Sequence, residues 1–288
     1  MLEKFFKLKE NGTNVKTEII AGITSFMTMA YILAVNPSIM SAAGMDHGAV
    51  FTATALAAFI GTLAMALFAN YPFALAPGMG LNAHFAYTVV LGMGYSWEFA
   101  LTAVFAEGII FILLSLTNVR EAIFNAIPKN LKSAVSVGIG LFIAFVGLQN
   151  AKIVIGGSTL VQLFSVEKYN ELNGVNASFN DVGITVALAL VGILITGILV
   201  IKNVKGNILW GILITWALGI LCQFVGLYVP NPDAGFHSLL PDFSNGISVP
   251  SMAPTFMKMD FAGVFSLDFV VIMFAFLFVD MFDTLGTL

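Results

Sequence analysis

Charged residues are scarce in this sequence: they make up 10% of its 288 residues, whereas hydrophobic residues make up 59%. A soluble domain of this length usually carries about 25% charged residues, because its surface must face water. Most of the surface of this protein is therefore expected to face the lipid bilayer. The formal net charge of −4 is small, which argues against nucleic acid as a partner, since that role favours a basic face.

Cysteine is nearly absent as well, with Cys222 as its single occurrence. One cysteine excludes an intramolecular disulfide and any metal site built from several cysteines. The sequence also lacks an H-E-x-x-H motif and a Walker A motif, so it predicts neither a zinc enzyme nor direct use of ATP. We expect no cofactor and no metal ion, and we expect a membrane transporter and not an enzyme.

Long apolar runs, in contrast, are abundant. A spanning helix needs about 20 largely apolar residues, and the sequence predicts eight segments of this kind. They are 19–35, 49–69, 73–91, 99–116, 131–148, 182–201, 208–228 and 267–288. The predicted fold class is therefore an all-α integral membrane protein. The proline-rich segment 229–266 is interpreted as an extracytoplasmic loop that forms a cap without chemistry.

The distribution of Lys and Arg predicts the orientation, because cytoplasmic loops are enriched in both residues. With eight spans and residues 1–18 inside, all Lys and Arg residues fall on the cytoplasmic side except Lys152, Lys168 and Lys258. No cleavable signal peptide is evident, so the first span is expected to direct insertion. We predict a multi-pass protein of the bacterial cytoplasmic membrane with its N-terminus in the cytoplasm.

The third span is interrupted by two prolines and two glycines: it reads Tyr71-Pro-Phe-Ala-Leu-Ala-Pro-Gly-Met-Gly-Leu-Asn-Ala-His-Phe85. Pro77 lacks an N–H group and restricts Ala76 to extended geometry, which predicts an extended piece over 73–76 and a helix that starts at Pro77 or just after it. Helices broken at membrane depth line cavities and mark the binding sites of transporters. Asn82 would place an amide in such a cavity; the alternative is a proline kink with an asparagine that only packs.

Acidic residues also lie inside apolar spans. Asp280 and Asp283 are three positions apart on the last segment, with Thr284 and Thr287 beside them, so one face of that helix is polar. An ionised carboxylate in lipid costs about 3 kcal/mol or more, and intramembrane acids therefore usually face a cavity or a pathway. Asp280, Asp283 and Glu107 are interpreted as proton-coupling candidates. The alternatives are an interfacial position for the aspartates and a purely structural partner for Glu107.

Four motifs, in order along the chain, resemble those of the AzgA-type branch of the nucleobase–cation symporters. This branch contains the adenine, guanine and hypoxanthine permeases, and its superfamily includes the xanthine and uracil permeases. The motifs are Ala21-Gly-Ile-Thr-Ser-Phe-Met-Thr-Met-Ala-Tyr-Ile-Leu33, Ala76-Pro-Gly-Met-Gly-Leu-Asn-Ala83, Gly138-Ile-Gly-Leu-Phe-Ile-Ala-Phe-Val-Gly-Leu-Gln-Asn150 and Asp283-Thr-Leu-Gly-Thr287. The resemblance implies a secondary active transporter that imports purine nucleobases by symport with H⁺ or Na⁺. It leaves open whether the protein forms a homodimer.

The same resemblance implies a 14-span fold of two inverted seven-helix repeats, divided into a core and a gate, with a short strand breaking helix three. This chain would hold the first repeat and the first helix of the second, so we expect it to be a C-terminally truncated fragment. The expected organisation is a cytoplasmic N-terminus, a first repeat, an extracytoplasmic loop and helix eight: 1–18, 19–228, 229–266 and 267–288.

The resemblance also assigns residues. Asn82 matches the asparagine that positions the base, and Asp283 matches the acid that hydrogen-bonds the purine ring. Gly80, Leu81 and Thr284 are expected to complete the substrate site. Three alternatives stay open: a transporter of another nucleobase such as uracil or xanthine, a channel without coupling, and a membrane enzyme that uses two aspartates as an acid pair.

Overall fold

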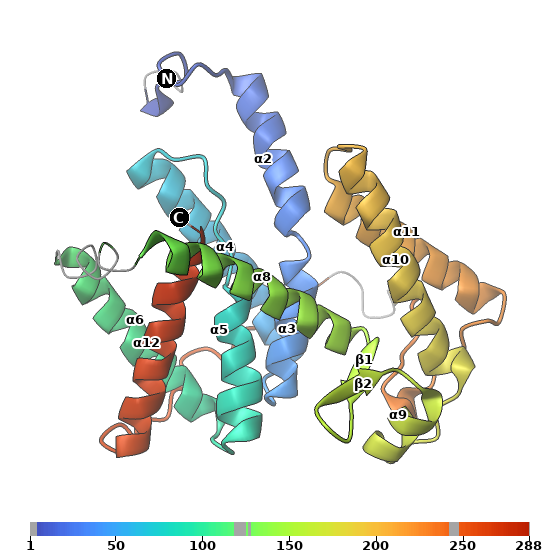
Figure 1. Ribbon diagram of the computed structural model, residues 1–288. Coiled ribbons are helices and arrows are strands. Elements are labelled where there is room, and N and C mark those ends of the chain that lie inside the picture. Colours follow the sequence, from blue (N-terminus) through green and yellow to red (C-terminus); the bar gives the residue numbers. More distant parts are fainter. Residues whose placement is uncertain (1–4, 118–124, 126–127, 242–247, 288) are drawn as a thin grey trace. The chain divides into compact units, whose positions relative to one another are not determined.

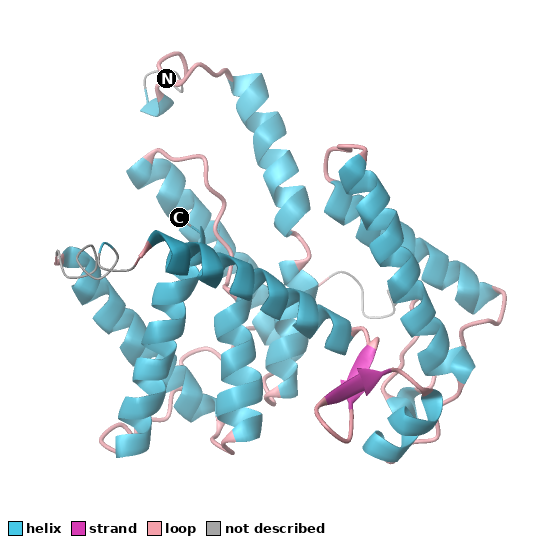
Figure 2. Cartoon of the chain, in the orientation of Figure 1, coloured by secondary structure: helices cyan, strands magenta, loops and turns pink. Residues whose placement is uncertain are grey.

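The computed structural model describes the chain except for residues 1–4, 118–124, 126–127, 242–247 and 288 (Figure 1). The side chains of residues 129, 132, 136 and 283–287 also lie outside this description. The described part is mostly helical, as Figure 2 shows, with one two-stranded sheet. Its α-helices are α2 Val15–Met29, α3 Ile32–Ala42, α4 His47–Ala64, α5 Met79–Ala83, α6 Trp97–Leu116, α8 Lys129–Asn150, α9 Val166–Asn173, α10 Ile184–Ile201, α11 Asn207–Phe224 and α12 Leu267–Thr287. Its π-helical segments are Met65–Ala69, His84–Gly92 and Phe179–Gly183, and its strands are β1 Val154–Gly156 and β2 Val161–Leu163.

Six helices in the described part are long and apolar enough to cross a membrane. They cover Val15–Ala42, His47–Ala69, Trp97–Leu116, Ser133–Asn150, Phe179–Ile201 and Asn207–Phe224. This confirms the prediction of a multi-pass helical membrane protein. The two further predicted spans differ from these six: the third contains helix only over residues 79–92, and α12 has 21 residues but ends in side chains that are not described. The total of eight spans therefore stays a prediction.

Helix starts follow from capping side chains, which satisfy backbone N–H groups that have no partner within the helix. Asn14 caps α2 by accepting from Thr17 N at 3.0 Å, and Asp46 caps α4 by accepting from Ala49 N at 2.7 Å. The first span divides into α2 and α3 at Ala30, and α3 contains Pro37, which removes one helical hydrogen bond. The first predicted span is thus an interrupted helix.

The chain forms two compact units, which are described separately. We call residues 1–30 and 144–248 the helix-pair unit, and residues 31–143 and 249–288 the cavity unit. In the cavity unit, the buried core joins α3, the π-helical segment 84–92, α6 and α12. It comprises Ile39, Ala43, Phe85, Ala86, Val89, Phe99, Ala100, Ala103, Phe269, Ile272, Met273 and Phe276. The fully buried alanines let these helices approach one another closely.

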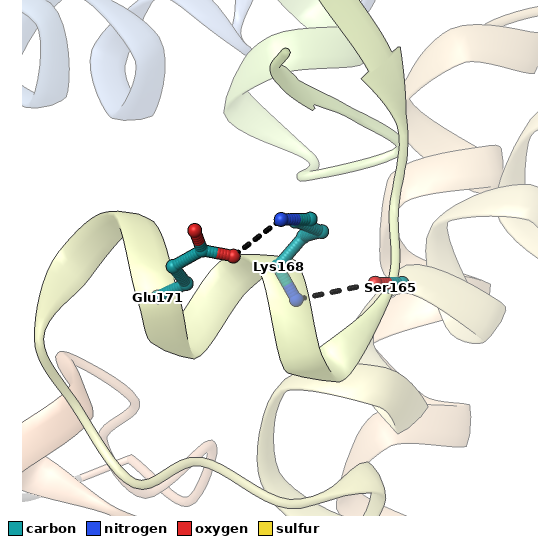
Figure 3. A network of polar contacts seen from close by, with 3 residues as sticks. All are labelled: Ser165, Lys168 and Glu171. Carbon is teal, nitrogen blue, oxygen red and sulfur yellow. Dashed lines mark hydrogen bonds and ion pairs between the residues drawn. The ribbon is translucent and has the colours of Figure 1, made fainter. Parts of the chain in front are cut away.

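In the helix-pair unit, α10 packs against α11, and a small cap covers the end at which α10 begins. The cap contains β1 and β2, which pair antiparallel with Ile155 opposite Gln162, together with α9. Figure 3 shows the first turn of α9: Ser165 Oγ accepts from Lys168 N at 3.2 Å, and the ammonium of Lys168 pairs with Glu171. Tyr169, on the same helix, is buried in the apolar cluster of the cap.

Candidate functional site

The third span is broken where the sequence predicts it. Residues 70–78 are not helical, and α5 begins at Met79 after Gly78, whose φ of −73° and ψ of 123° are extended. Because Pro77 cannot donate a backbone hydrogen bond, the helix starts only beyond it. The prediction of a helix that starts at or just after Pro77 is confirmed. The continuation, His84–Gly92, is π-helical, a geometry that often occurs at functional sites.

Residues 70–78, in contrast, pair with no other strand in the described part of the chain. Leu75 exchanges two hydrogen bonds with the side chain of Thr62 on α4: Leu75 N donates to Thr62 Oγ1 at 2.9 Å, and Thr62 Oγ1 approaches Leu75 O at 3.3 Å. An extended segment becomes a strand only when its backbone pairs with another backbone. Here the structure pairs Leu75 with the Thr62 hydroxyl on α4, and the strand that the resemblance implies for this segment stays a prediction.

Asn82 belongs to a chain of polar groups that joins three helices of the cavity unit. Asn82 Nδ2 donates to Asn36 Oδ1 at 2.5 Å, and Asn36 Nδ2 donates to Thr54 Oγ1 at 2.6 Å. Thr54 Oγ1 in turn donates to Val50 O at 2.7 Å. Asn36 on α3 and Thr54 on α4 are 5% and 3% exposed. Buried polar groups of this kind are costly unless they are paired, so the three side chains hold one another in place.

These polar groups border a cavity of about 600 Å³ in the same unit. Pockets for small ligands typically measure about 300–1,000 Å³ and have mostly apolar walls with a few polar groups. The polar part of this wall includes Asn36, Thr54 and Asn82, and Leu81 is adjacent. Its apolar part comprises Met40, Met45, Val50, Ala53, Ala57, Phe85, Leu101, Val104 and Phe105. The arrangement suits a small ligand that has both polar and apolar parts.

The segment 229–266, predicted as an extracytoplasmic loop and called the outer loop below, contributes to the same cavity. Its sequence did not indicate this contribution. Its lining residues are Met252, Thr255, Phe256, Met257 and Met259. Two threonines contact the loop. Thr52 Oγ1 on α4 donates to Pro250 O at 2.8 Å, and Thr102 Oγ1 on α6 shares its proton between Asp260 O at 2.9 Å and Glu98 O at 2.8 Å. This part of the loop therefore forms part of the cavity wall.

Glu107 lies buried on α6, with 4% of its surface exposed. Its Oε1 has no hydrogen-bond partner within the described part of the chain. Asp280 on α12 is an electrostatic neighbour of Glu107, and α6 and α12 pack against each other. Burying an ionised carboxyl group in an apolar helix is energetically unfavourable, and such groups usually mark an ion or substrate pathway. Glu107 and Asp280 therefore stay candidates for proton coupling.

His84 follows Asn82 by two positions and packs against α12. Its ring makes an edge contact with Phe276 at 5.1 Å between centroids, and its Nε2 is buried without a hydrogen-bond partner among the described residues. This position agrees with a packing role.

The other predicted site residues are only partly placed. Gly80 lies on α5 and has open space where a side chain would be. Asp283 and Thr284 belong to α12, which packs against α5, but their side chains lie outside the described residues. Among the described residues, no group of three His, Cys, Asp or Glu side chains could hold a metal ion. Asn36 and Thr54 were not predicted, although an asparagine followed by Pro37 within an apolar helix is a signal of buried polarity.

Comparison with known proteins gives one family and several curated relatives. The model of the Permease family matches residues 16–288. The protein MJ0326 of Methanocaldococcus jannaschii is 50% identical over 288 residues, which cover all of this chain and 59% of the relative. The guanine/hypoxanthine permease PbuG of Bacillus subtilis is 43% identical, with 100% of this chain and 61% of the relative covered. The adenine permease AdeP of Escherichia coli is 37% identical, with 100% and 58% covered. The chain thus spans about three fifths of the length of these relatives.

Proposed function

Because the chain belongs to the Permease family, we propose that the protein is a secondary active transporter that imports purine nucleobases by symport with H⁺. Relatives named guanine/hypoxanthine and adenine permeases, at 43% and 37% identity, support hypoxanthine, guanine or adenine as the cargo. These names confirm the branch that the four sequence motifs resembled. The relatives are longer than this chain, which supports the proposal that it is the N-terminal part of such a transporter.

The observation that carries this proposal is the position of Asn82 on the helix that follows the break in the third predicted span, beside a cavity of about 600 Å³. A purine is a planar molecule with hydrogen-bond donors and acceptors around its edge and apolar faces. An amide can bind the edge, and aromatic side chains such as Phe85 and Phe105 can pack on the faces. We assign Asn82, Leu81 and Gly80 to the substrate site.

Helix α12 contributes the remaining substrate residues in this proposal. Asp283 would hydrogen-bond the purine ring, with Thr284 beside it. The packing of α12 against α5, which carries Asn82, supports this assignment. A carboxylate accepts two hydrogen bonds at once, so it suits the N–H groups of a purine edge.

Coupling to H⁺ is assigned to the acidic residues of the cavity unit, namely Glu107, Asp280 and Asp283. The burial of Glu107 and its electrostatic proximity to Asp280 support this assignment, because a proton taken up by one of the two carboxylates would relieve the repulsion between them. Na⁺ is the alternative coupling ion. Uptake that depends on external pH and not on external Na⁺ would support H⁺.

The fold proposed for the whole protein is the 14-span inverted repeat, with its N-terminus in the cytoplasm of a bacterial cell and its spans in the cytoplasmic membrane. We assign the cavity unit to the core and the helix-pair unit to the gate. The division of the chain into two compact units supports this assignment. Transport would then require one unit to move against the other around the bound base.

Uptake of radiolabelled bases tests the proposal. The full-length protein is expressed in a bacterium that lacks purine transport, and hypoxanthine, guanine, adenine and uracil are supplied with and without a protonophore. We expect purine uptake that the protonophore abolishes, and a decrease of about tenfold or more in Asn82→Ala, since a hydrogen bond to the base is lost. The control Asn11→Ala changes an exposed residue of the N-terminus.

Other outcomes would change the assignment. Uptake of uracil alone would make the protein a transporter of another nucleobase. Purine flux that persists with the protonophore and never exceeds the external concentration would indicate a channel. No uptake of any base would contradict the proposal.

A further inference from the structure

We propose that Asn36 and Thr54 orient the amide of Asn82 so that its oxygen faces the cavity, and that the cargo must therefore offer an N–H group at that position. This inference rests on the proposed transport of nucleobases and adds to it a positioning device and a specificity rule. It concerns the cavity unit alone and follows from the order of donors and acceptors in one chain of hydrogen bonds.

The order begins at Thr54, whose hydroxyl has one proton. In the structure that proton goes to Val50 O, 2.7 Å away, so Thr54 Oγ1 accepts from its other neighbour. The neighbour on its other side is Asn36, at 2.6 Å, which must present its NH₂ group and not its oxygen. The orientation of the Asn36 amide is thus fixed by the hydroxyl.

The same argument extends to Asn82. Since the NH₂ group of Asn36 faces Thr54, its Oδ1 faces the other way and accepts from Asn82 Nδ2 at 2.5 Å. If either amide were rotated by half a turn, two N–H groups or two oxygens would face each other. Asn36 and Thr54 are nearly fully buried, so water cannot relieve such a mismatch. An unpaired buried donor or acceptor is unfavourable. Reversing the whole chain of hydrogen bonds would turn the Thr54 hydroxyl toward Asn36 and lose its bond to Val50 O, so the direction in the structure is favoured by one hydrogen bond.

Asn82 is half-buried and lines the cavity, and its Nδ2 is held on the side of Asn36. Its oxygen remains as the acceptor that can meet a ligand, and Nδ2 keeps one further N–H group. A planar base would bind with a ring N–H group opposite Asn82 Oδ1. Every unsubstituted purine nucleobase has such a group, whereas a methyl group on that nitrogen would replace the donor with an apolar obstacle.

A competition experiment on the full-length protein tests this inference. Uptake of labelled hypoxanthine is measured against unlabelled hypoxanthine and its 1-, 3-, 7- and 9-methyl derivatives. We expect at least one N-methyl derivative to compete at least about tenfold less well than hypoxanthine, because the acceptor on Asn82 is left unpaired. If the imidazole N–H group is the one recognised, the 7- and 9-methyl derivatives should both compete poorly, since each lacks it. Thr54→Val removes the group that orients Asn36, so we expect the discrimination against that derivative to fall severalfold.

Thr54→Ser is the matched control, because serine keeps the hydroxyl; it should retain the discrimination of the unchanged protein. Thr24→Val makes the same substitution in a hydroxyl that bonds Ile20 O on its own helix in the helix-pair unit, and should also retain it. Protein in the membrane is quantified for every variant. If Thr54→Val fails to accumulate, Asn36→Ala serves in its place, since it removes the acceptor of Asn82 Nδ2 directly.

The outcomes separate the two proposals. Purine uptake with discrimination that is lost in Thr54→Val or Asn36→Ala, and kept in Thr54→Ser, supports the inference. Purine uptake with equal discrimination in all variants, or equal competition by every methyl derivative, overturns the inference and leaves the transport proposal standing. Absence of uptake of any base by the unchanged protein overturns both.

Discussion

Gly192 on α10 faces Thr215 on α11 so closely that a Cβ atom on the glycine would lie 2.6 Å from the threonine hydroxyl oxygen. A second contact mirrors the first: Gly211 on α11 faces Thr196 on α10, and a Cβ atom on Gly211 would lie even closer to the hydroxyl oxygen of Thr196. Each threonine hydroxyl also donates to the glycine carbonyl four residues before it on its own helix, at 2.8 Å for Thr196 and 2.7 Å for Thr215. Two glycine–threonine pairs thus set the distance between the helices, as small residues do in membranes.

Substitution of either glycine should therefore increase the distance between α10 and α11. We expect Gly192→Ala and Gly211→Ala to destabilise the protein by about 1–3 kcal/mol, the usual effect of overpacking. The measurement is the thermal unfolding midpoint of the full-length protein in detergent. Gly197→Ala is the control on the same helix, because its Cβ would meet nothing within 4 Å. Equal midpoints for the three variants would show that the close contacts do not hold the helices together.

The outer loop should loosen when its anchors are removed. Thr255 in this loop is 8% exposed, so a cysteine introduced there should react slowly with a water-soluble maleimide in a Cys222→Ser background. Thr52→Val and Thr102→Val each remove a hydrogen bond to the loop, and we expect each to accelerate the labelling severalfold. Thr24→Val, in the helix-pair unit, is the control. Unchanged labelling would mean that the loop is held by its apolar contacts alone.

Glu107 should be required for the coupling of purine transport to H⁺ and not for folding. We expect Glu107→Gln, which keeps the shape but cannot give up a proton, to lose accumulation of purine while exchange of labelled for unlabelled purine continues. Glu98→Gln changes an acid in the first turn of the same helix and should accumulate purine normally. The accumulation ratio and the exchange rate are measured in membrane vesicles with an imposed pH gradient. Normal accumulation by Glu107→Gln would assign Glu107 a structural role.

Asp181 should stabilise the cap of the helix-pair unit. Its Oδ1 accepts from Ser178 N at 2.6 Å and from Val182 N at 2.7 Å, and its Oδ2 accepts from Asn231 Nδ2 at 2.8 Å. Asp181→Asn puts an NH₂ group in place of one acceptor oxygen. We expect it to lower the free energy of unfolding by about 1.5–3 kcal/mol, the usual contribution of hydrogen bonds to charged groups.

The unfolding midpoint measures this effect as well. The exposed Asp233 provides the control, because Asp233→Asn makes the same substitution in the same cap without a buried network. A midpoint for Asp181→Asn equal to that of Asp233→Asn would show that the carboxylate is dispensable for the cap.

Features set by local chemistry could be predicted from the sequence. The break before α5 was predictable because Pro77 excludes a helix over itself and the residue before it, whatever the surroundings. The apolar spans were predictable because the bilayer imposes their length and composition. Glu107 could be predicted as a candidate functional residue because acidic residues are rare in such apolar segments.

Features that need a partner far along the chain could not be predicted. Asn36 meets Asn82 across 46 positions and Thr54 across 18, and no periodicity in the sequence encodes those contacts. The part played by the outer loop in the cavity also depends on tertiary contacts, namely those of Thr52 and Thr102.

The attachment of the outer loop has a practical consequence. Both threonine anchors belong to the cavity unit, so the segment between Pro250 and Asp260 must travel with that unit as one piece. Met257, within this segment, is 68% exposed, so a cysteine introduced there would be accessible to a fluorescent dye. A fluorophore at this position would report on the cavity unit, and single-molecule fluorescence recordings could follow the proposed movement of that unit in real time.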